Sequence, residues 1–234
     1  MQGKKLITNL FFKSSRLVFL RHGESEWNVK KIVQGSSPDP SITLSAAGRE
    51  SVQPTLANLP KPQLLISSPL LRCKQTAEAW FGVPYEQIPI PTKVNPAMAE
   101  INAGIYEGLY LDELKNDLVW QQWMSNPASF EFPGGEKLTE FSDRVLRGAG
   151  AICAEHGNSK QITYVITHGV VMRVLKCFLA DQDLAYLWSH QVTNLEQICL
   201  SDAQIMKFQQ FHKQCSINDD TVSPKRASGK GHTT

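Results

Sequence analysis

The sequence predicts an α/β domain with a mostly parallel sheet. Short runs of branched and aromatic residues alternate with longer runs of helical periodicity, which is typical of this fold class. Of the 234 residues, 41% are hydrophobic, which suits one domain with a sizeable core. We expect a surface lead-in over residues 1–15, the folded domain over 16–212 and a polar, disordered tail over 213–234.

The first half of the chain supplies two central strands, one edge strand and two helices. The edge strand contains prolines, which cannot donate to the hydrogen-bond ladder of a sheet centre. Pro54 predicts a kink or an early end in the first helix, and Ser68 followed by Pro69 is typical of the start of the second. The predicted strands cover residues 16–21, 64–67 and 82–90, and the predicted helices cover 44–59 and 68–81.

The second half continues the alternation. A Pro-Gly-Gly break at residues 133–135 precedes a long helix with apolar residues at three- and four-residue spacing. The predicted elements are one or two short helices within 111–124, a helix over 136–155, a central strand over 162–167, a helix over 170–179 and a closing antiparallel pair over 196–200 and 203–211.

The charge balance excludes partners with extended negative surfaces. The chain has 24 Lys and Arg against 22 Asp and Glu, a formal net charge of +2. Duplex nucleic acid or an anionic membrane requires a broad electropositive face, and no apolar run approaches the ~18 residues of a spanning helix. Any anionic partner is therefore expected to be small and bound locally.

The cysteines and the N-terminus indicate a cytoplasmic protein. The five cysteines are an odd number without a CxxC pair, and several lie in apolar runs, where a reduced thiol acts as a small hydrophobe. No A-x-A-like cleavage site follows the short apolar patch near the N-terminus. The cysteines are Cys73, Cys153, Cys177, Cys199 and Cys215.

Two predicted strands run directly into His-Gly. These segments read RLVFLRHG, which ends at His22 and Gly23, and ITYVITHG, which ends at His168 and Gly169. In open α/β sheets ligands collect at the carboxyl ends of the strands, and glycine lets the backbone turn and approach a ligand closely. A single histidine at a strand end is more often structural, but the repeated pattern, with Arg21 before the first histidine, makes a shared site equally plausible.

A second arginine lies at the start of the predicted helix 68–81. Arg72 falls in its first turn, where free N–H groups and the helix dipole favour an anion, and a guanidinium adds a fork that matches phosphate or carboxylate oxygens. The alternative is an exposed arginine paired with Glu78. Considered alone, Arg72 favours that alternative.

Together Arg21, Arg72, His22 and His168 suit the transfer of a phosphoryl group. Hydrolysis of phosphate monoesters needs accelerations up to about 10²¹-fold, which a covalent route through an imidazole divides into two easier steps. Neighbouring arginines should lower the pKa of His22 and keep it neutral and nucleophilic. The leaving alkoxide needs a proton, and Glu100 in a glycine-flanked loop is the candidate donor. Equally open is the alternative that Glu100 and Glu107 are solvated loop residues.

Five segments, taken in order, resemble the histidine phosphatase superfamily, also called the phosphoglycerate mutase-like or RHG family. The resemblance covers about residues 16–209 and implies a three-layer α/β/α sandwich around a mixed, mostly parallel sheet. The segments are LRHGESEWN (20–28), SSPLLRCKQTAE (67–78), AEINAGIYEG (99–108), PGGEKLTEFSDRV (133–145) and THGVVMR (167–173).

The resemblance also implies roles for individual residues. His22 would be the phosphorylated nucleophile, Glu100 the proton donor, and Asn28 a further phosphate ligand. No metal or organic cofactor is implied, in agreement with the lack of a metal-binding motif in the sequence. The rest of the expected phosphate and substrate site consists of Arg21, Arg72, His168, Gly169 and, on a substrate-side loop, Gln34 and Gly35.

Two departures from the family favour a phosphatase acting on a small phosphorylated metabolite. Glycolytic mutases follow the donor glutamate with Arg-His-Tyr-Gly, which holds the phosphoglycerate carboxylate, whereas this chain has Ile-Asn-Ala-Gly at 101–104. The insertion at 109–132 is also shorter than in mutases, which gives water easier access to a phosphohistidine. The alternatives are a phosphoglycerate mutase and a catalytically idle member that binds phosphorylated ligands or partners.

The sequence leaves the substrate undetermined. That choice depends on the loops around residues 29–41 and 101–124. Four aromatic residues there either line an apolar entrance or belong to the core, and for the two tryptophans the core is the favoured interpretation. The four are Tyr106, Tyr110, Trp120 and Trp123.

Overall fold

A five-stranded sheet forms the middle of the molecule. The computed structural model describes residues 16–222, and its strand order is β3-β2-β4-β1-β5. All neighbours pair in parallel except β5, which runs antiparallel to β1, so the prediction of a mixed, mostly parallel sheet is confirmed. The strands are β1 (Leu17–Arg21), β2 (Leu64–Ser67), β3 (Thr92–Val94), β4 (Thr163–Thr167) and β5 (Gln197–Cys199).

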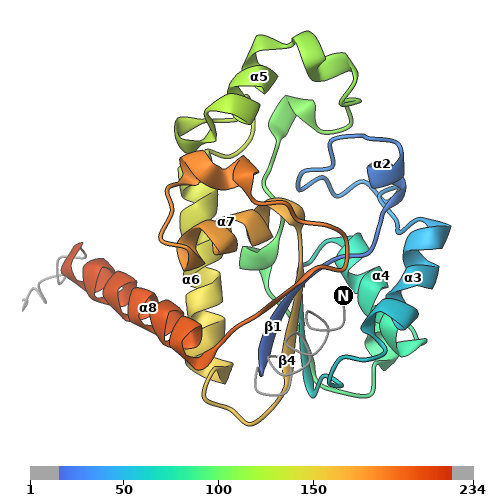
Figure 1. The fold of residues 1–234 in the computed structure, drawn as a ribbon, viewed down its shortest axis with the longest axis vertical. Coiled ribbons are helices and arrows are strands. Elements are labelled where there is room, and N and C mark those ends of the chain that lie inside the picture. The colour runs from blue at the N-terminus through green and yellow to red at the C-terminus, as the bar shows by residue number, and fades with distance from the viewer. Residues whose placement is uncertain (1–15, 223–234) are drawn as a thin grey trace, which may run out of the picture.

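Helices cover both faces of this sheet, which gives the three-layer α/β/α arrangement (Figure 1). One face carries α3 (Ala46–Leu56) and α4 (Leu71–Phe81), and the other carries α6 (Leu138–His156) and α7 (Gly169–Leu179), with α8 (Asp202–Val222) packed on α6. The remaining α-helices are α2 (Glu26–Val29) and α5 (Leu118–Ser125). The short 3-10 helices are η1 (Tyr85–Gln87), η2 (Pro96–Met98), η3 (Gly104–Tyr106), η4 (Glu113–Asn116), η5 (Pro127–Ser129) and η6 (Leu184–Ser189).

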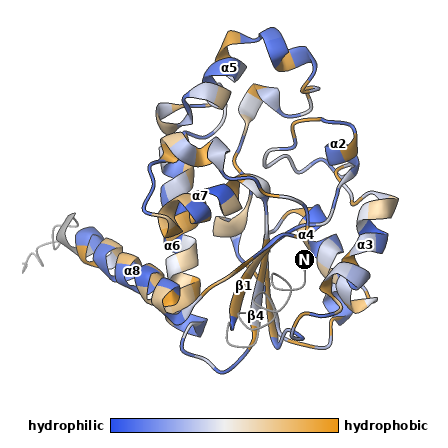
Figure 2. Ribbon diagram, viewed as in Figure 1, coloured by the Kyte–Doolittle hydropathy of each residue, from blue (hydrophilic) through white to orange (hydrophobic). Residues whose placement is uncertain are grey.

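Alternating side chains of the strands divide the core into two clusters. In β1, Val18 and Leu20 pack against the α3 and α4 side, while Leu17 and Phe19 face the α6 and α7 side. Because both faces are covered, the central strands are mostly apolar, as the hydropathy colouring shows (Figure 2). No helix within residues 16–222 has the length and apolar character needed to cross a membrane.

The predicted edge strand over residues 82–90 is wrong. This segment contains the 3-10 turn η1, and the edge strand of the sheet is β3, which begins just after Pro91. The physical reason is the prolines at positions 84, 89 and 91, each of which removes a backbone donor, so pairing with β2 begins only where they end. The helix α3 ends at Leu56, two residues after Pro54.

The C-terminal predictions are also corrected. Residues 203–211, predicted as a strand, lie within α8, and β5 pairs with β1 instead. The helix continues to Val222, so the predicted disordered tail is wrong for residues 213–222, while residues 1–15 and 223–234 lie outside the described part of the chain. Phe208 anchors α8 in the core, and Asp219 accepts a 2.7 Å hydrogen bond from Arg147 of α6, which extends the attachment beyond the predicted end.

Candidate active site

The paired ends of β1 and β4 bring His22 and His168 together. Arg21 and Thr167 are register partners in the parallel pair, and the next residue on each strand is the histidine. The His22 N–H donates to the Thr167 carbonyl at 2.9 Å, and the two imidazole centroids lie 5.3 Å apart. The repeated strand-His-Gly pattern therefore corresponds to two neighbouring strand ends.

His22 has one nitrogen free to react. Its Nδ1 lies 2.6 Å from the Gly23 carbonyl oxygen, and because a carbonyl only accepts, Nδ1 carries the proton. Burial, with Arg72 and Arg21 nearby, holds the pKa of His22 well below its usual range. The imidazole is therefore neutral near pH 7, with its lone pair on Nε2, and the ring lines a pocket.

His168 is completely buried and is held by α4 side chains and by Ser68. Its Nε2 lies 2.7 Å from Ser68 Oγ and 3.4 Å from Cys73 Sγ. Burial, followed by the charge of Arg72, keeps the pKa of His168 well below its usual range. The prediction that Ser68 caps the following helix is wrong, because α4 begins at Leu71 and the Ser68 hydroxyl is turned to His168.

Three guanidinium groups converge on the pocket, and none of them forms a salt bridge with a described carboxylate. Arg21 Nη1 donates to the Val192 carbonyl and Arg72 Nη2 to the Gly35 carbonyl, both at 2.8 Å, yet the Nε atoms of Arg21, Arg72 and Arg173 are buried without a partner among the described residues. None of the ion pairs between described side chains involves these arginines. Burial lowers the pKa of all three, that of Arg21 to about 10. Unpaired buried cations are costly unless an anion binds between them.

The prediction missed Arg173. It lies one helical turn after Gly169 on α7, and a Cβ at Gly169 would lie 3.2 Å from Arg173 Nη1 and 3.5 Å from Arg21 Nε. The guanidinium also stacks on the Trp188 ring, 4.9 Å from its centroid. The sequence signal that could have found Arg173 is its i, i+4 spacing from Gly169, because these two positions share one face of a helix.

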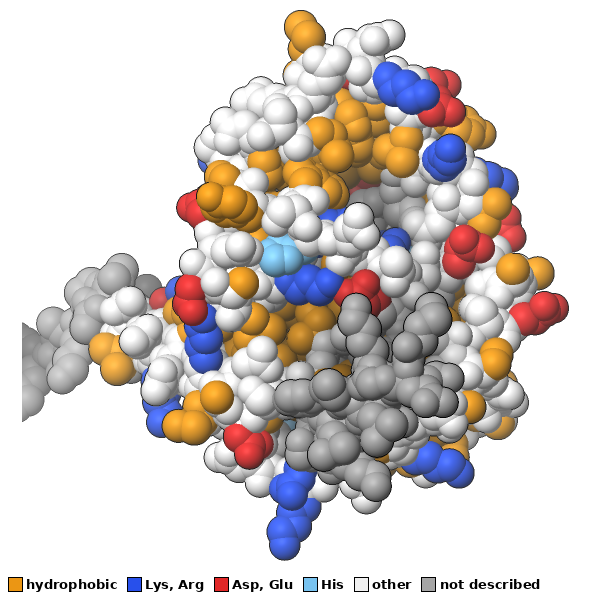
Figure 3. Space-filling view, viewed as in Figure 1, with side chains coloured by type: hydrophobic (Ala, Val, Ile, Leu, Met, Phe, Trp, Pro, Cys, Tyr) orange, Lys and Arg blue, Asp and Glu red, His pale blue; other side chains and the backbone are white. Residues whose placement is uncertain are grey.

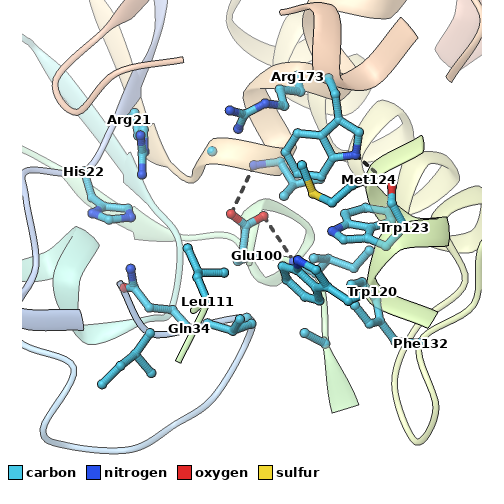
Figure 4. Close-up of a pocket in the computed structure, with 18 of the residues that line it drawn as sticks. Arg21, His22, Gln34, Glu100, Leu111, Trp120, Trp123, Met124, Phe132 and Arg173 are labelled. Atoms are coloured by element: carbon cyan, nitrogen blue, oxygen red, sulfur yellow. Dashed lines mark hydrogen bonds between the residues drawn. The ribbon is translucent and has the colours of Figure 1, made fainter. Parts of the chain in front are cut away.

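Glu100 lies between the cationic side of the pocket and its aromatic side (Figure 4). Its Oε2 accepts from the Val170 N–H at 3.1 Å, at the start of α7, and its Oε1 accepts from the Ile101 N–H at 3.2 Å. The carboxyl group is buried and fixed by backbone donors. Of the two loop glutamates considered, Glu107 has a different environment, because its Oε1 accepts from the Ser36 and Ala103 N–H groups and joins two loops.

The predicted phosphate ligand Asn28 and the predicted substrate-loop residues Gln34 and Gly35 have different positions. Gln34 and Gly35 line the pocket, and Gly35, with φ of +48°, presents its carbonyl to Arg72. Asn28 is outside the lining set: its Oδ1 accepts from Ser25 N at 3.1 Å and Ser25 Oγ at 3.0 Å in the capping box of α2.

Asn194 is a second residue that the sequence did not single out. Its Nδ2 donates to the His22 carbonyl at 3.0 Å and to Asn28 Oδ1 at 3.4 Å. The same loop supplies the Val192 carbonyl that holds Arg21. No sequence pattern pointed to it, because the loop approaches the site only through the pairing of β5 with β1.

The rest of the pocket is apolar. The cavity has a volume of about 390 Å³, and one side is built mainly by α5, η6 and the turns near them. The interpretation of Trp120 and Trp123 as core alone is incomplete: Trp123 is buried, yet both line the cavity. Tyr106 is buried outside the lining set, and Tyr110 is half exposed. The large apolar side chains of this side are Leu111, Trp120, Trp123, Met124, Phe132 and Trp188.

Candidate ligands for a metal are not clustered in this region. Within residues 16–222, no group of three or more His, Cys, Asp or Glu side chains is arranged to hold a metal ion. The arginines, the histidines and Glu100 thus form a site whose geometry suits an anion and the transfer of a proton.

Comparison with known proteins gives one consistent family. The profile of the histidine phosphatase superfamily (branch 1) matches residues 17–210. Phosphoserine phosphatase 1 of Hydrogenobacter thermophilus is 30% identical over 76% of this chain and 82% of its own length. A 2,3-bisphosphoglycerate-dependent phosphoglycerate mutase of Nitrobacter winogradskyi is 30% identical over 61% of this chain and 76% of its own length. The solved structure of Bacillus stearothermophilus YhfR superimposes with a TM-score of 0.67 at 26% identity, covering 76% of this chain and 86% of that one.

Proposed function

The chain belongs to the histidine phosphatase superfamily and is a phosphomonoester hydrolase, and we propose that it works through a phosphohistidine on His22. The observation that carries this proposal is the His22 imidazole, held neutral with Nε2 free, beside three guanidinium groups whose buried Nε atoms have no hydrogen-bond partner among the described residues. A phosphoryl dianion supplies the missing negative charge, and Nε2 supplies the nucleophile.

In the first step, His22 Nε2 attacks the phosphorus atom and the P–O bond to the alcohol breaks. Arg21, Arg72 and Arg173 neutralise the equatorial oxygens. His168 is outside the lining set and packs beside His22, with the ring centroids 5.3 Å apart. The departing oxygen takes a proton from the Glu100 carboxyl group, which its two backbone donors hold between the cationic and aromatic sides.

In the second step, water attacks the phosphohistidine. The Glu100 carboxylate accepts a proton from this water as its oxygen bonds to phosphorus, and the P–N bond breaks. His22 returns to its neutral form, stabilised by the Nδ1–H donation to Gly23 O, and inorganic phosphate leaves. Atoms and charge balance without any added reactant besides water.

The lining of the pocket favours hydrolysis over a mutase reaction. At the positions where mutases hold a phosphoglycerate carboxylate, Ile101 and Ala103 present apolar side chains to the cavity. Asn102 Oδ1 accepts from the Gly104 N–H at 2.9 Å and is occupied within its own turn. These residues offer no cation to a second acidic group.

Relatives named as phosphoserine phosphatases and mutases point to small phosphorylated substrates, and we take such a molecule as the substrate class here. We place the reaction in the cytoplasm, because all five cysteines are free thiols and three of them, Cys73, Cys153 and Cys177, are buried.

The test uses para-nitrophenyl phosphate in buffer with EDTA. The proposal expects turnover by the wild-type protein, loss of at least about 10⁴-fold in kcat/KM for His22→Ala, and no loss for the control His212→Ala on α8. Turnover that survives His22→Ala would contradict the proposal. A folded wild-type protein that binds phosphate esters without turnover would instead support the idle, ligand-binding alternative.

A further inference from the structure

We infer that the alcohol released from the substrate carries an aromatic ring or an apolar body of similar size. The inference rests on the proposed function, because it assigns the phosphoryl group to the cationic end of the cavity. The remainder of the same cavity then has to receive the alcohol, and its walls are aromatic and aliphatic.

The position of Glu100 fixes the direction in which the alcohol extends. The proton donor has to touch the bridging oxygen, and Glu100 lies with Arg21 and His22 on one side and Trp120 and Trp123 on the other (Figure 4). An alcohol that leaves past Glu100 therefore enters the aromatic side. Hydrophobic side chains also gather beside the hollow in the upper part of the molecule, where α5 lies (Figure 3).

Trp188 is held in this wall by a hydrogen bond and by ring packing. Trp188 Nε1 donates to the Trp123 carbonyl at 2.9 Å, and the two rings meet edge to face with centroids 5.1 Å apart. Trp123 also packs on Phe132, with centroids 4.8 Å apart. The rings are therefore held in place, and their faces offer stacking surface to an apolar group.

The charged side chains lining the cavity are Arg21, Arg72, Arg173 and Glu100, and the proposed reaction uses all four for the phosphoryl group and for proton transfer. Arg173 also stacks on Trp188 of the aromatic side, 4.9 Å from its centroid. Arg21 and Arg173 lie together at Gly169, and Glu100 is bound to backbone N–H groups. The ammonium and carboxylate of phosphoserine would lose water against tryptophan and methionine without gaining partners, which disfavours that substrate.

The rim of the cavity allows this to be tested without disturbing the core. Leu111 and Met124 line the cavity and are 39% and 45% exposed, so polar replacements there leave the fold intact. Two exposed residues outside the lining set are matched controls: Leu118, 79% exposed on α5, and Met206, 57% exposed on α8.

The experiment compares kcat/KM for n-propyl phosphate, 3-phenylpropyl phosphate and O-phosphoserine, all esters of primary alcohols. Burial of the phenyl ring should raise kcat/KM about 10- to 100-fold over n-propyl phosphate, and O-phosphoserine should be no better than n-propyl phosphate. Leu111→Ser and Met124→Ser should each lower the phenylpropyl-to-propyl ratio about fourfold or more. Leu118→Ser and Met206→Ser should leave that ratio unchanged.

The result that overturns the inference is a phenylpropyl-to-propyl ratio near one, or a preference for O-phosphoserine. A ratio that responds equally to the rim variants and to their controls would overturn it as well. Failure of the proposed function has a different signature, because His22→Ala would then retain turnover of n-propyl phosphate whatever the ratio.

Discussion

The two ends of the cavity are built in different ways. The cationic end comes from regular strand-to-helix steps: His22 follows β1, His168 follows β4, and Arg72 is the second residue of α4. The aromatic end comes from α5, η6 and short turns. The carboxyl ends of inner strands hold reacting groups in fixed positions, because the strand backbone is hydrogen-bonded to a neighbour on both sides. Turns tolerate a wider variety of side chains. Changes at the cationic end should therefore affect every substrate alike, and changes at the aromatic end should depend on the alcohol.

Among the substitutions that compare the two ends of the cavity, Arg72→Ala is expected to have the largest effect. This side chain is buried, touches the Gly35 carbonyl and has a free Nε in the pocket, so its loss removes a donor that acts on the transferring phosphoryl group. We expect kcat/KM to fall about 10³-fold, equally for n-propyl and 3-phenylpropyl phosphate. The matched control is Arg49→Ala, whose guanidinium is half exposed and paired with Glu78 at 3.8 Å. A loss restricted to one ester would break the division between the two ends.

Glu100→Gln tests the boundary between the ends. Without a proton to donate, the enzyme should lose about 10²- to 10³-fold in kcat/KM with n-propyl phosphate, because an alkoxide is a poor leaving group. With para-nitrophenyl phosphate the loss should stay below about tenfold, because nitrophenolate needs little protonation. Equal losses on both esters would remove the role of proton donor from Glu100.

Acid should destabilise the folded protein through the two histidines at the cationic end of the cavity. Burial holds the pKa values of His22 and His168 below the ordinary value of 6.5, so on acidification the unfolded chain takes up protons first. The stability that these groups give above pH 6.5 is therefore lost as the pH falls, by about 1.4 kcal/mol per pH unit for each histidine. Urea unfolding at pH 7 and pH 5.5 measures this loss. His168→Gln should show a smaller loss than the wild type, and an identical loss would contradict the assignment.

Gly169→Ala should give the smallest effect. The added Cβ meets Arg173 Nη1 at 3.2 Å, so that guanidinium must shift by a few tenths of an ångström, while Arg21 Nε at 3.5 Å stays in ordinary contact. We expect kcat/KM to fall about three- to tenfold for all esters, while the free energy of unfolding changes by less than about 1 kcal/mol, because alanine suits the first turn of α7. Lost stability with full activity would show that the glycine serves folding alone.

The sequence predicted the parts of the molecule that repeat a regular pattern. Apolar runs predicted the strands β1, β2 and β4, and helical spacing predicted the helices α6 and α7. The repeated His-Gly pattern predicted two histidines close together at the carboxyl ends of neighbouring strands. Where a residue serves more than one purpose the prediction failed: Ser68 is typical of a helix start but contacts His168. Because of the prolines, the edge strand is β3 and not the predicted segment 82–90. Contacts with α6 stabilise α8 beyond residue 212, the predicted end of the domain.

The features that the sequence did not reveal depend on contacts between distant segments. Asn194 lies 172 residues from His22 and reaches its carbonyl only after β5 pairs with β1. The aromatic wall joins α5 to η6 through the bond from Trp188 to Trp123, which are 65 residues apart. The composition states how many tryptophans there are, and the residue spacing within 111–124 predicts short helices. Neither determines which ring faces line a cavity.

The most direct measurement is rapid-quench trapping of the covalent intermediate. Wild-type protein is mixed with phosphorus-32-labelled phosphomonoester, quenched in alkali within the first turnover, and digested for peptide mapping. We predict one alkali-stable, acid-labile phosphoryl group on His22, absent in His22→Ala. Label on His168 or on a serine, or turnover without any label on His22, would contradict it.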